Sequence, residues 1–365
     1  MATDTTVISP RDQLAQRWAV LREDNPKLRI RQAANELQVS ELELLLCREP
    51  EDVRPLKPEF PALLEAMESV GEVMILSRNE SVVHEVTGTF KDFHTASSGA
   101  MGLAVGQMDV RVFFRQWHFG YHVQEQVRSG LRESLQFFDA HGQAIQKIYR
   151  TDNTDAESWQ ALLRQFLADG STSPNIQPPR APLKRADRQG LDAEALRQDW
   201  ASLKDVHHFN AMLKRHSVDR LTALELVGPT YASRLDSNES EATTPEQSVL
   251  GQLLTLVRES QCPIMVFVGN PGIVQIHTGP VGRVLPTGPW LNILDPSFNL
   301  HANVSSIRQW WRVQRPSSDG PVTSLEGYDA NSELVVTLFG ARKPGQPESP
   351  QWQHEMRTLE SRRCD

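Results

Sequence analysis

The chain contains two copies of one sequence pattern, and this tandem duplication constrains its fold more than any other feature. Residues 14–47 align with residues 196–228, and residues 73–90 align with residues 264–281. Three shorter matches continue the series: RQW at 115–117 with RQW at 308–310, residues 134–149 with 324–339, and Trp159 with Trp352. Because all blocks recur in one order, the sequence predicts two similar folded halves.

Each copy is predicted to begin with helices and to continue with strands. In the first copy, apolar residues recur at helical spacing over residues 11–24, 30–46 and 60–70. Period-two, β-branched segments follow from residue 73, ending in a hairpin over residues 135–149. Helices followed by strands indicate an α+β fold, in which each half is a helical subdomain followed by a large, mostly antiparallel sheet.

A segment rich in Pro, Ser and basic residues separates the copies. Residues 170–190 read GSTSPNIQPPRAPLKRADRQG, a composition typical of a linker. We therefore predict an N-terminal repeat over residues 1–170, a linker over 171–190 and a C-terminal repeat over 191–365. Clefts between domains often bind ligands, so a ligand is expected between the two halves.

Composition narrows the class of function. The 46 Asp and Glu outnumber the 38 Lys and Arg, and a net charge of −8 argues against a primary role in coating nucleic acid. Cys47, Cys262 and Cys364 fit neither a metal knuckle nor a disulfide framework, which favours a reducing compartment. The sequence has neither a secretory leader pattern nor 18 uninterrupted apolar residues, so we expect a cytoplasmic protein without membrane insertion.

Residues shared by both copies are explained by packing and turns, so function is sought where the copies differ. The clearest difference is Asp205-Val-His207-His208-Phe209, which faces Asp24-Asn-Pro-Lys-Leu28 in the first copy. Asp205 is expected to cap a helix, Phe209 to begin its apolar stripe, and His207 to point away from that stripe.

The two histidines allow two interpretations. They are either surface residues of a first helical turn or metal ligands. A helix N-terminus disfavours the cationic imidazole, and the neutral ring is the form that coordinates iron or zinc. No acidic or cysteine partner stands at ligand spacing, which argues against a closed zinc site, whereas one axial histidine is enough for haem.

The second difference is the segment Asp109–Phe114, which faces Phe298–His301 in the second copy. Alternation along a strand predicts that Val110 and Val112 point to one side and Asp109, Arg111 and Phe113 to the other. Arg111 beside Phe113 is then either a fixed cation next to an aromatic wall or an arginine on a solvated sheet face.

Taken together, the motifs resemble the HemS/ChuS/PhuS family of cytoplasmic haem-handling proteins, often called haemin-degrading factors. The resemblance covers roughly residues 12–360. The matching segments are KDVHHF (204–209), MDVRVFF (108–114), SLQFFDAHGQAIQKIY (134–149), QIHTGPVGRV (275–284), GPWLNILDPSFNLH (288–301), RPSSDGPVTSLE (315–326) and LFGARKPG (338–345).

The resemblance implies one haem b in the cleft between the halves. It assigns the axial iron ligand to His207, with His208 as the alternative, and the distal cation to Arg111, walled by Phe113. Arg220, and more weakly Arg315 and Arg342, are implied as cations for the haem propionates. Some relatives carry a third histidine at the position where this sequence has Asn210.

The implied function has more than one form. One is a bacterial haem carrier that receives haem from an uptake system with an ABC transporter and delivers it to a haem oxygenase. Another is an enzyme that opens the porphyrin and releases iron with electrons from an external donor. An alternative outside the resemblance is a duplicated interaction protein without haem.

Overall fold

The helical and strand periodicities of the sequence are realised in the computed structural model, which describes residues 9–128, 130–170, 173–235, 244–343 and 345–364. The described chain divides into two units. Unit 1 consists of the described residues of 1–76, 87–180 and 271–273, and unit 2 of those of 77–86, 181–270 and 274–365. A short piece of each repeat thus belongs to the unit formed mainly by the other repeat.

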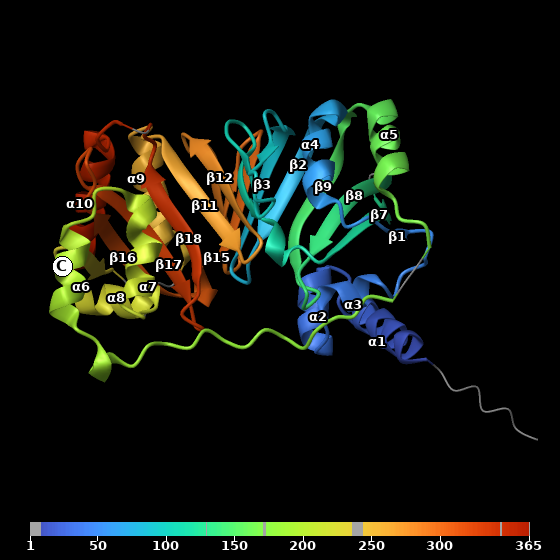
Figure 1. Cartoon of the computed structure of the whole chain (residues 1–365), viewed down its shortest axis with the longest axis horizontal. Helices are drawn as coiled ribbons and strands as arrows, with labels where there is room; N and C mark the ends of the chain where they lie inside the picture. The colour runs from blue at the N-terminus through green and yellow to red at the C-terminus, as the bar shows by residue number, and fades with distance from the viewer. Residues whose placement is uncertain (1–8, 129, 171–172, 236–243, 344, 365) are drawn as a thin grey trace, which may run out of the picture. The chain divides into compact units, whose positions relative to one another are not determined.

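Unit 1 places helices at both ends of a set of antiparallel strands (Figure 1). Helices α1–α3 lie at one end of the strands, and α4 and α5 lie at the other. The helices are α1 (Pro10–Asp24), α2 (Ile30–Leu37), α3 (Glu41–Leu45), α4 (Phe60–Ala66), α5 (Ala156–Phe166) and the 3₁₀ turns η1 (Met67–Val70) and η2 (Phe114–Gln116).

The strands of unit 1 form two runs of hydrogen-bonded neighbours, ordered β1-β7-β8-β9-β2 and β6-β5-β4. Their pairings are antiparallel, for example Leu135 of β8 with Ile148 of β9. The strands are β1 (Val53–Pro55), β2 (Gly71–Arg78), β4 (His94–Thr95), β5 (Met101–Ala104), β6 (Asp109–Phe113), β7 (Phe119–Val127), β8 (Gly130–Phe138) and β9 (Ala144–Thr154).

Unit 2 repeats this plan. Its helices are α6 (Ala193–Ala201), α7 (Phe209–Arg215), α8 (Arg220–Val227), α9 (Val249–Glu259), α10 (Pro350–Cys364) and the 3₁₀ turns η3 (Arg188–Gly190), η4 (Val206–His208), η6 (Pro245–Gln247) and η7 (Val304–Ser306). Within the unit, α6–α8 gather at one end of the strands and α9 and α10 at the other (Figure 1).

The strands of unit 2 also form two runs, ordered β3-β15-β14-β13 and β10-β16-β17-β18-β11-β12. The strands are β3 (Val82–Thr89), β10 (Ala232–Arg234), β11 (Ile264–Asn270), β12 (Ile273–Gly279), β13 (Val284–Thr287), β14 (Trp290–Leu294), β15 (Phe298–Asn303), β16 (Ile307–Arg315), β17 (Val322–Asp329) and β18 (Leu334–Gly340). Helices followed by antiparallel strands confirm the predicted α+β class.

Equivalent residues make similar contacts in the two repeats. Trp159 and Trp352 are both fully buried on the helix that follows the last strand. The Trp159 indole N–H donates to Glu133 and that of Trp352 to the carbonyl of Thr323, which occupy matching positions on β8 and β17. These shared contacts agree with the predicted duplication.

Two sequence-based expectations are wrong in detail. The predicted helix over residues 30–46 is broken into α2 and α3, because Gln38 ends α2 in the left-handed conformation at φ 58°. The alignment of RQW at 115–117 with RQW at 308–310 is also wrong. Phe119 pairs with Phe138, and Gln309 pairs with Tyr328, which is the counterpart of Phe138 in the second repeat. Gln309 therefore corresponds to Phe119 and not to Gln116.

Three further features bear on the expectations from composition. Among the described side chains, Cys47 and Cys262 are free thiols, and the side chain of Cys364 lies outside the described set. None of the helices in the described segments has the length and apolarity needed to cross a bilayer. The described part of the predicted linker is residues 173–190; residues 173–187 contain neither helix nor strand, and residues 188–190 form the 3₁₀ turn η3.

Candidate functional site

The two candidate histidines lie on the short turn η4, which is fixed by its neighbours on both sides. Asp205 caps the turn as predicted, and its Oδ1 accepts the backbone N–H of His207 at 2.8 Å. That hydrogen bond, followed by the charges of His207, His208 and Arg342, lowers the pKa of Asp205. Both imidazoles are exposed, so an anchored backbone presents them to solvent.

The residue after the turn anchors it in the core of unit 2. Phe209 begins α7, is 3% exposed, and meets Trp200 edge-to-face at 4.7 Å between ring centroids. Met212 and Leu213 are also buried, which confirms the predicted apolar stripe. His207 and His208 therefore protrude at the edge of a well-packed helix rather than on a loose loop.

Arg220 and Arg315 converge on the same phenylalanine. Their guanidinium carbons lie 5.1 Å and 4.4 Å from the centroid of the Phe209 ring. Both arginines also pair with the carboxylate of Glu326. The structure thus brings two of the predicted propionate cations together on Phe209, the residue that directly follows the histidine turn.

Arg342, the third predicted cation of unit 2, follows β18. Its Nη1 donates to the carbonyl of Gln346 at 3.2 Å, and its charge contributes to lowering the pKa of Asp205. Arg342 is therefore within electrostatic range of the carboxylate that caps the histidine turn.

Arg111 and Phe113 lie on β6 of unit 1 and show the predicted alternation. Val110 and Val112 are fully buried, whereas Arg111 and Phe113 on the other face are partly exposed. Nη1 of Arg111 donates to Asp109 Oδ1 and to the carbonyl of Ala104 at 3.1 Å. Burial raises the pKa of Asp109, and the Arg111 charge opposes that rise.

The Asp109 pair leaves part of the Arg111 guanidinium available. Within the described part of the chain, Nε and Nη2 of Arg111 make no hydrogen bond, and the side chain is 33% exposed. Arg111 is thus a cation that Asp109 holds in place and that still has N–H donors to offer.

Sequence reasoning missed Glu326 and Tyr328, which hold the arginine cluster of unit 2 together. Glu326 is fully buried and its carboxylate accepts from the Tyr328 hydroxyl at 2.6 Å. A signal was present, because Glu326 stands where the first repeat has Gln136 in otherwise similar segments.

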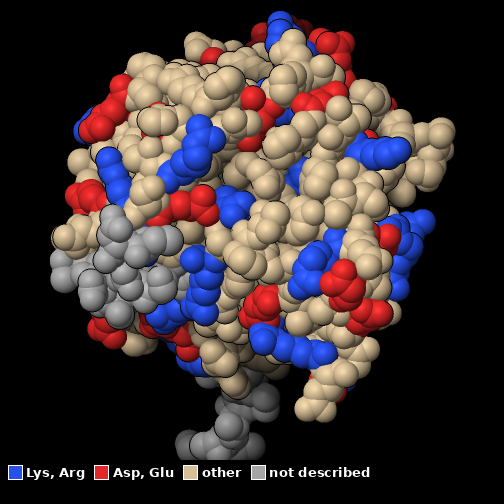
Figure 2. Space-filling model, turned by 90° about the vertical axis from the view of Figure 1, so that its left-hand side faces the viewer, with Lys and Arg blue, Asp and Glu red and all other residues tan. Residues whose placement is uncertain are grey.

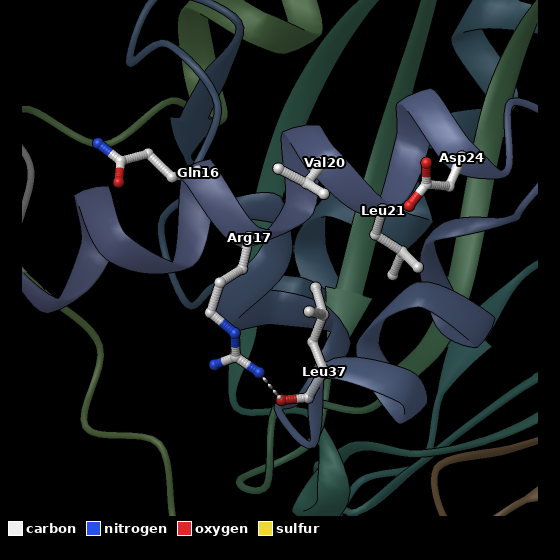
Figure 3. Close-up of a pocket in the computed structure, with 6 residues that line it drawn as sticks. All are labelled: Gln16, Arg17, Val20, Leu21, Asp24 and Leu37. Carbon is white, nitrogen blue, oxygen red and sulfur yellow. Dashed lines mark hydrogen bonds between the residues drawn. The ribbon is translucent and has the colours of Figure 1, made fainter.

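Neither the charged face drawn in Figure 2 nor the groove drawn in Figure 3 points to a competing site among the described residues. A groove of about 450 Å³ on α1 and α2 contains none of the predicted residues; its wall includes Val20 and Leu37, and Arg17 donates to the Leu37 carbonyl at 3.1 Å (Figure 3). On the face drawn in Figure 2, basic and acidic side chains are interspersed among the coloured residues. That face lacks, in its described part, the continuous cationic stripe typical of nucleic-acid binding.

Comparison with known proteins places these residues in a family. The model of the haemin-degrading HemS/ChuX domain matches residues 38–166 and 217–359, one segment in each repeat. The chain belongs to the HemS family. The match confirms the resemblance drawn from the motifs.

Relatives of the HemS family match almost the whole chain. The hemin transport protein HemS of Yersinia enterocolitica is 36% identical over 339 residues, which cover 93% of this chain and 95% of that protein. The hemin transport protein HmuS of Yersinia pestis is also 36% identical, over 95% of this chain and 97% of its own.

Solved structures of the family share the fold. Holo-PhuS, described as a heme-binding protein from Pseudomonas aeruginosa, is 40% identical over 95% of this chain and 98% of its own, with a TM-score of 0.86. ChuS, described as a heme oxygenase from E. coli, is 36% identical over 95% and 99% of the two chains, with a TM-score of 0.82.

Proposed function

We propose that this chain binds one haem b, with His207 as the axial ligand of the iron, and carries it in the cytoplasm as part of bacterial haem uptake. The observation that carries this proposal is the histidine turn η4. It presents two exposed imidazoles on a backbone fixed by Asp205 and Phe209, in a member of the HemS family. Neutral imidazole is a common axial ligand of haem iron.

Cations near the turn support the proposal. Haem carries two carboxylates; Arg220 lies against the ring of Phe209, the residue that follows the histidine turn, and the charge of Arg342 contributes to lowering the pKa of Asp205, which caps the turn. Arg111, with unused N–H donors, is the candidate for the opposite side of the iron, where a guanidinium can donate to a bound oxygen ligand. Phe113 is the candidate aromatic wall beside it.

The decisive test is a haemin titration followed in the Soret region. We expect the wild type to saturate at one haem per chain. His207→Ala should weaken binding at least tenfold or change the Soret maximum, because the axial ligand is lost. His118→Ala is a matched control, since His118 is also exposed and belongs to unit 1. If wild type causes no Soret shift, haem binding is wrong; if only His208→Ala alters the spectrum, the ligand is His208.

A second candidate function is breakdown of the haem. It is favoured by the description of the domain family as haemin-degrading and of ChuS as a heme oxygenase. The test adds ascorbate, or NADPH with a reductase, to the haem complex in the presence of catalase. Loss of the Soret band with release of chelatable iron would identify an enzyme that needs an external electron donor. A stable band would identify a carrier.

If the chain is a carrier, it needs two protein partners. A carrier requires a donor, for which we propose the cytoplasmic side of a haem ABC transporter, and an acceptor, for which we propose a haem oxygenase. Transfer of haem from the loaded chain to a purified haem oxygenase, monitored by difference spectra, tests the second partner directly.

A further inference from the structure

Five side chains of unit 2 form one polar cluster centred on Glu326, and all but Arg220 are buried. Arg220 of α8 donates to both carboxylate oxygens, from Nε at 2.9 Å and from Nη2 at 2.7 Å. Arg315 of β16 donates to Oε1 and to the Ser324 hydroxyl, which itself donates to Oε1 at 3.1 Å. The Tyr328 hydroxyl donates to Oε2. Glu326 therefore joins a helix to two neighbouring strands.

The cluster is unbalanced in charge. Two guanidinium groups share one carboxylate, which leaves one net positive charge. Burial alone would raise the pKa of Glu326, but the two arginine charges reverse this and lower it far below the usual range. The Glu326 carboxylate is thus ionised in the folded protein near neutral pH. Because both guanidinium groups are also charged, the cluster keeps one net positive charge at that pH.

The two arginines differ in what they can still bind. The Arg315 side chain is 3% exposed, so an incoming ligand cannot reach it. The Arg220 side chain is 24% exposed, and its Nη1 makes no hydrogen bond to Glu326, although the guanidinium also interacts with the Tyr328 hydroxyl. Nη1 of Arg220 is therefore the donor through which the surplus charge can meet an anion.

Phe209 connects this cluster to the histidine turn. Its ring lies against both guanidinium groups, and its backbone directly follows His208. A cation on an aromatic face is attracted to the ring, and a planar guanidinium can also stack on it. The position of the turn and the position of Arg220 are therefore set by the same contacts.

The first repeat lacks this arrangement, as its equivalent residues show. Ser40 and Asp219 cap α3 and α8, so Glu41 is the counterpart of Arg220. In the strands, Glu125 pairs with Arg132, and Arg315 pairs with Val322. Because Arg132 and Val322 occupy equivalent positions in the two repeats, Glu125 is the counterpart of Arg315. Both arginines thus replace glutamates, and they do so in the repeat that has the histidines.

We propose that Glu326 is a positioning residue of the haem site: it holds both arginines on the Phe209 ring, so that Arg220 donates to a haem carboxylate while Arg315 is only a buried counter-charge. This inference rests on the proposed haem binding. It adds a role for Glu326 and removes Arg315 from the residues that contact the ligand.

The test compares iron protoporphyrin IX with its dimethyl ester, in which both carboxylates are masked. The quantity measured is the ratio of the two dissociation constants, ester over free acid. We expect wild type to bind the ester at least tenfold more weakly, the size expected for loss of one charged hydrogen bond. Arg220→Gln should lower the ratio at least fivefold, because it removes the Arg220 hydrogen bond and leaves only the contribution of Arg342. Glu326→Gln should lower the ratio at least fivefold while leaving the Soret maximum of the complex unchanged.

Two variants separate positioning from general damage. Arg315→Lys keeps the buried charge and should leave the ratio within twofold of wild type. Glu133→Gln removes a comparable carboxylate from unit 1, which accepts from Arg150 and His122, and should affect stability but not the ratio. If Glu326→Gln fails to fold, Glu326→Asp keeps the charge at shorter reach and should still lower the ratio.

The outcomes distinguish this inference from the proposed function. If wild type binds neither porphyrin, the proposed function fails. If wild type binds the free acid and the ester equally, or if Glu326→Gln keeps the wild-type ratio, only this inference fails. A collapse of the ratio in Arg315→Lys equal to that in Arg220→Gln would overturn the division of roles between the arginines.

Discussion

At the scale of single residues, two histidines of unit 2 are held in surroundings that oppose their charge. His277 lies flat against Phe298 at 3.8 Å between ring centroids, and His84 lies 5.0 Å from the same ring. Burial lowers the pKa of His277 to about 4, partly opposed by Asp295, and burial and the His277 charge lower that of His84 to about 3. Both rings are neutral at pH 7.

These lowered pKa values predict acid sensitivity. Between the unfolded pKa near 6.5 and the folded value near 4, unfolded chains bind a proton at His277 that folded chains do not, so stability falls as pH falls. His277→Phe keeps the stacked ring and removes this proton uptake. We expect the loss in free energy of unfolding from pH 7 to pH 4.5 to shrink by about 1–2 kcal/mol, measured by urea unfolding.

A matched substitution checks the cause. His354→Phe changes an exposed histidine on α10 of the same unit and should leave the pH dependence as in wild type. Equal pH profiles for His277→Phe and wild type would contradict the assignment.

At the scale of elements, the terminal helix α10 packs closely on β18 because Gly340 has no side chain. A Cβ built on Gly340 would lie 2.5 Å from both Cβ and Cγ of Trp352, closer than atoms pack. The same tryptophan is fully buried, and its indole donates to the Thr323 carbonyl at 3.0 Å. The tryptophan therefore fixes the height of the helix above the sheet and requires glycine beneath it.

Gly340→Ala should consequently destabilise unit 2. Because Trp352 is held by packing and by its hydrogen bond, we expect a loss of about 1–3 kcal/mol in the free energy of unfolding. Gly190→Ala is the control, since a Cβ at Gly190 meets nothing within 4 Å. Thermal unfolding followed by circular dichroism measures both, and equal melting temperatures for Gly340→Ala and wild type would refute the packing argument.

At the scale of the whole molecule, the segment between the repeats is held at its two ends and exposed between them. Toward unit 1, the Gln177 N–H donates to the Ala140 carbonyl at 2.8 Å. Toward unit 2, Arg185 donates to Thr222 and pairs with Glu225. Residues 178–184 are exposed and contain two sites for trypsin, Arg180 and Lys184.

Limited digestion tests this description. We expect trypsin to cut first after Arg180 or Lys184 and to give two fragments of nearly equal length, because a protease needs an exposed, extended segment. The double variant Arg180→Gln, Lys184→Gln should delay that cut at least fivefold on a gel time course. A first cut inside either repeat, identified by mass spectrometry, would be the contrary result.

The sequence by itself determined the features that depend on local spacing. The cap at Asp205, the buried stripe from Phe209 to Leu213 and the alternation around Arg111 follow from helical and strand periodicity, which neighbouring residues alone create. The order of elements, the duplication and the membership of the HemS family follow from longer runs of the same kind.

Only the tertiary structure decided which distant groups meet. The bond between Arg220 and Glu326 joins residues 106 positions apart, and the pairing of Gln309 with Tyr328 overturned an alignment that matched three letters. The division into units, in which residues 77–86 belong to unit 2 and 271–273 to unit 1, was equally hidden. These outcomes depend on packing and on buried charge, whose energies arise only when remote segments come together and exclude water.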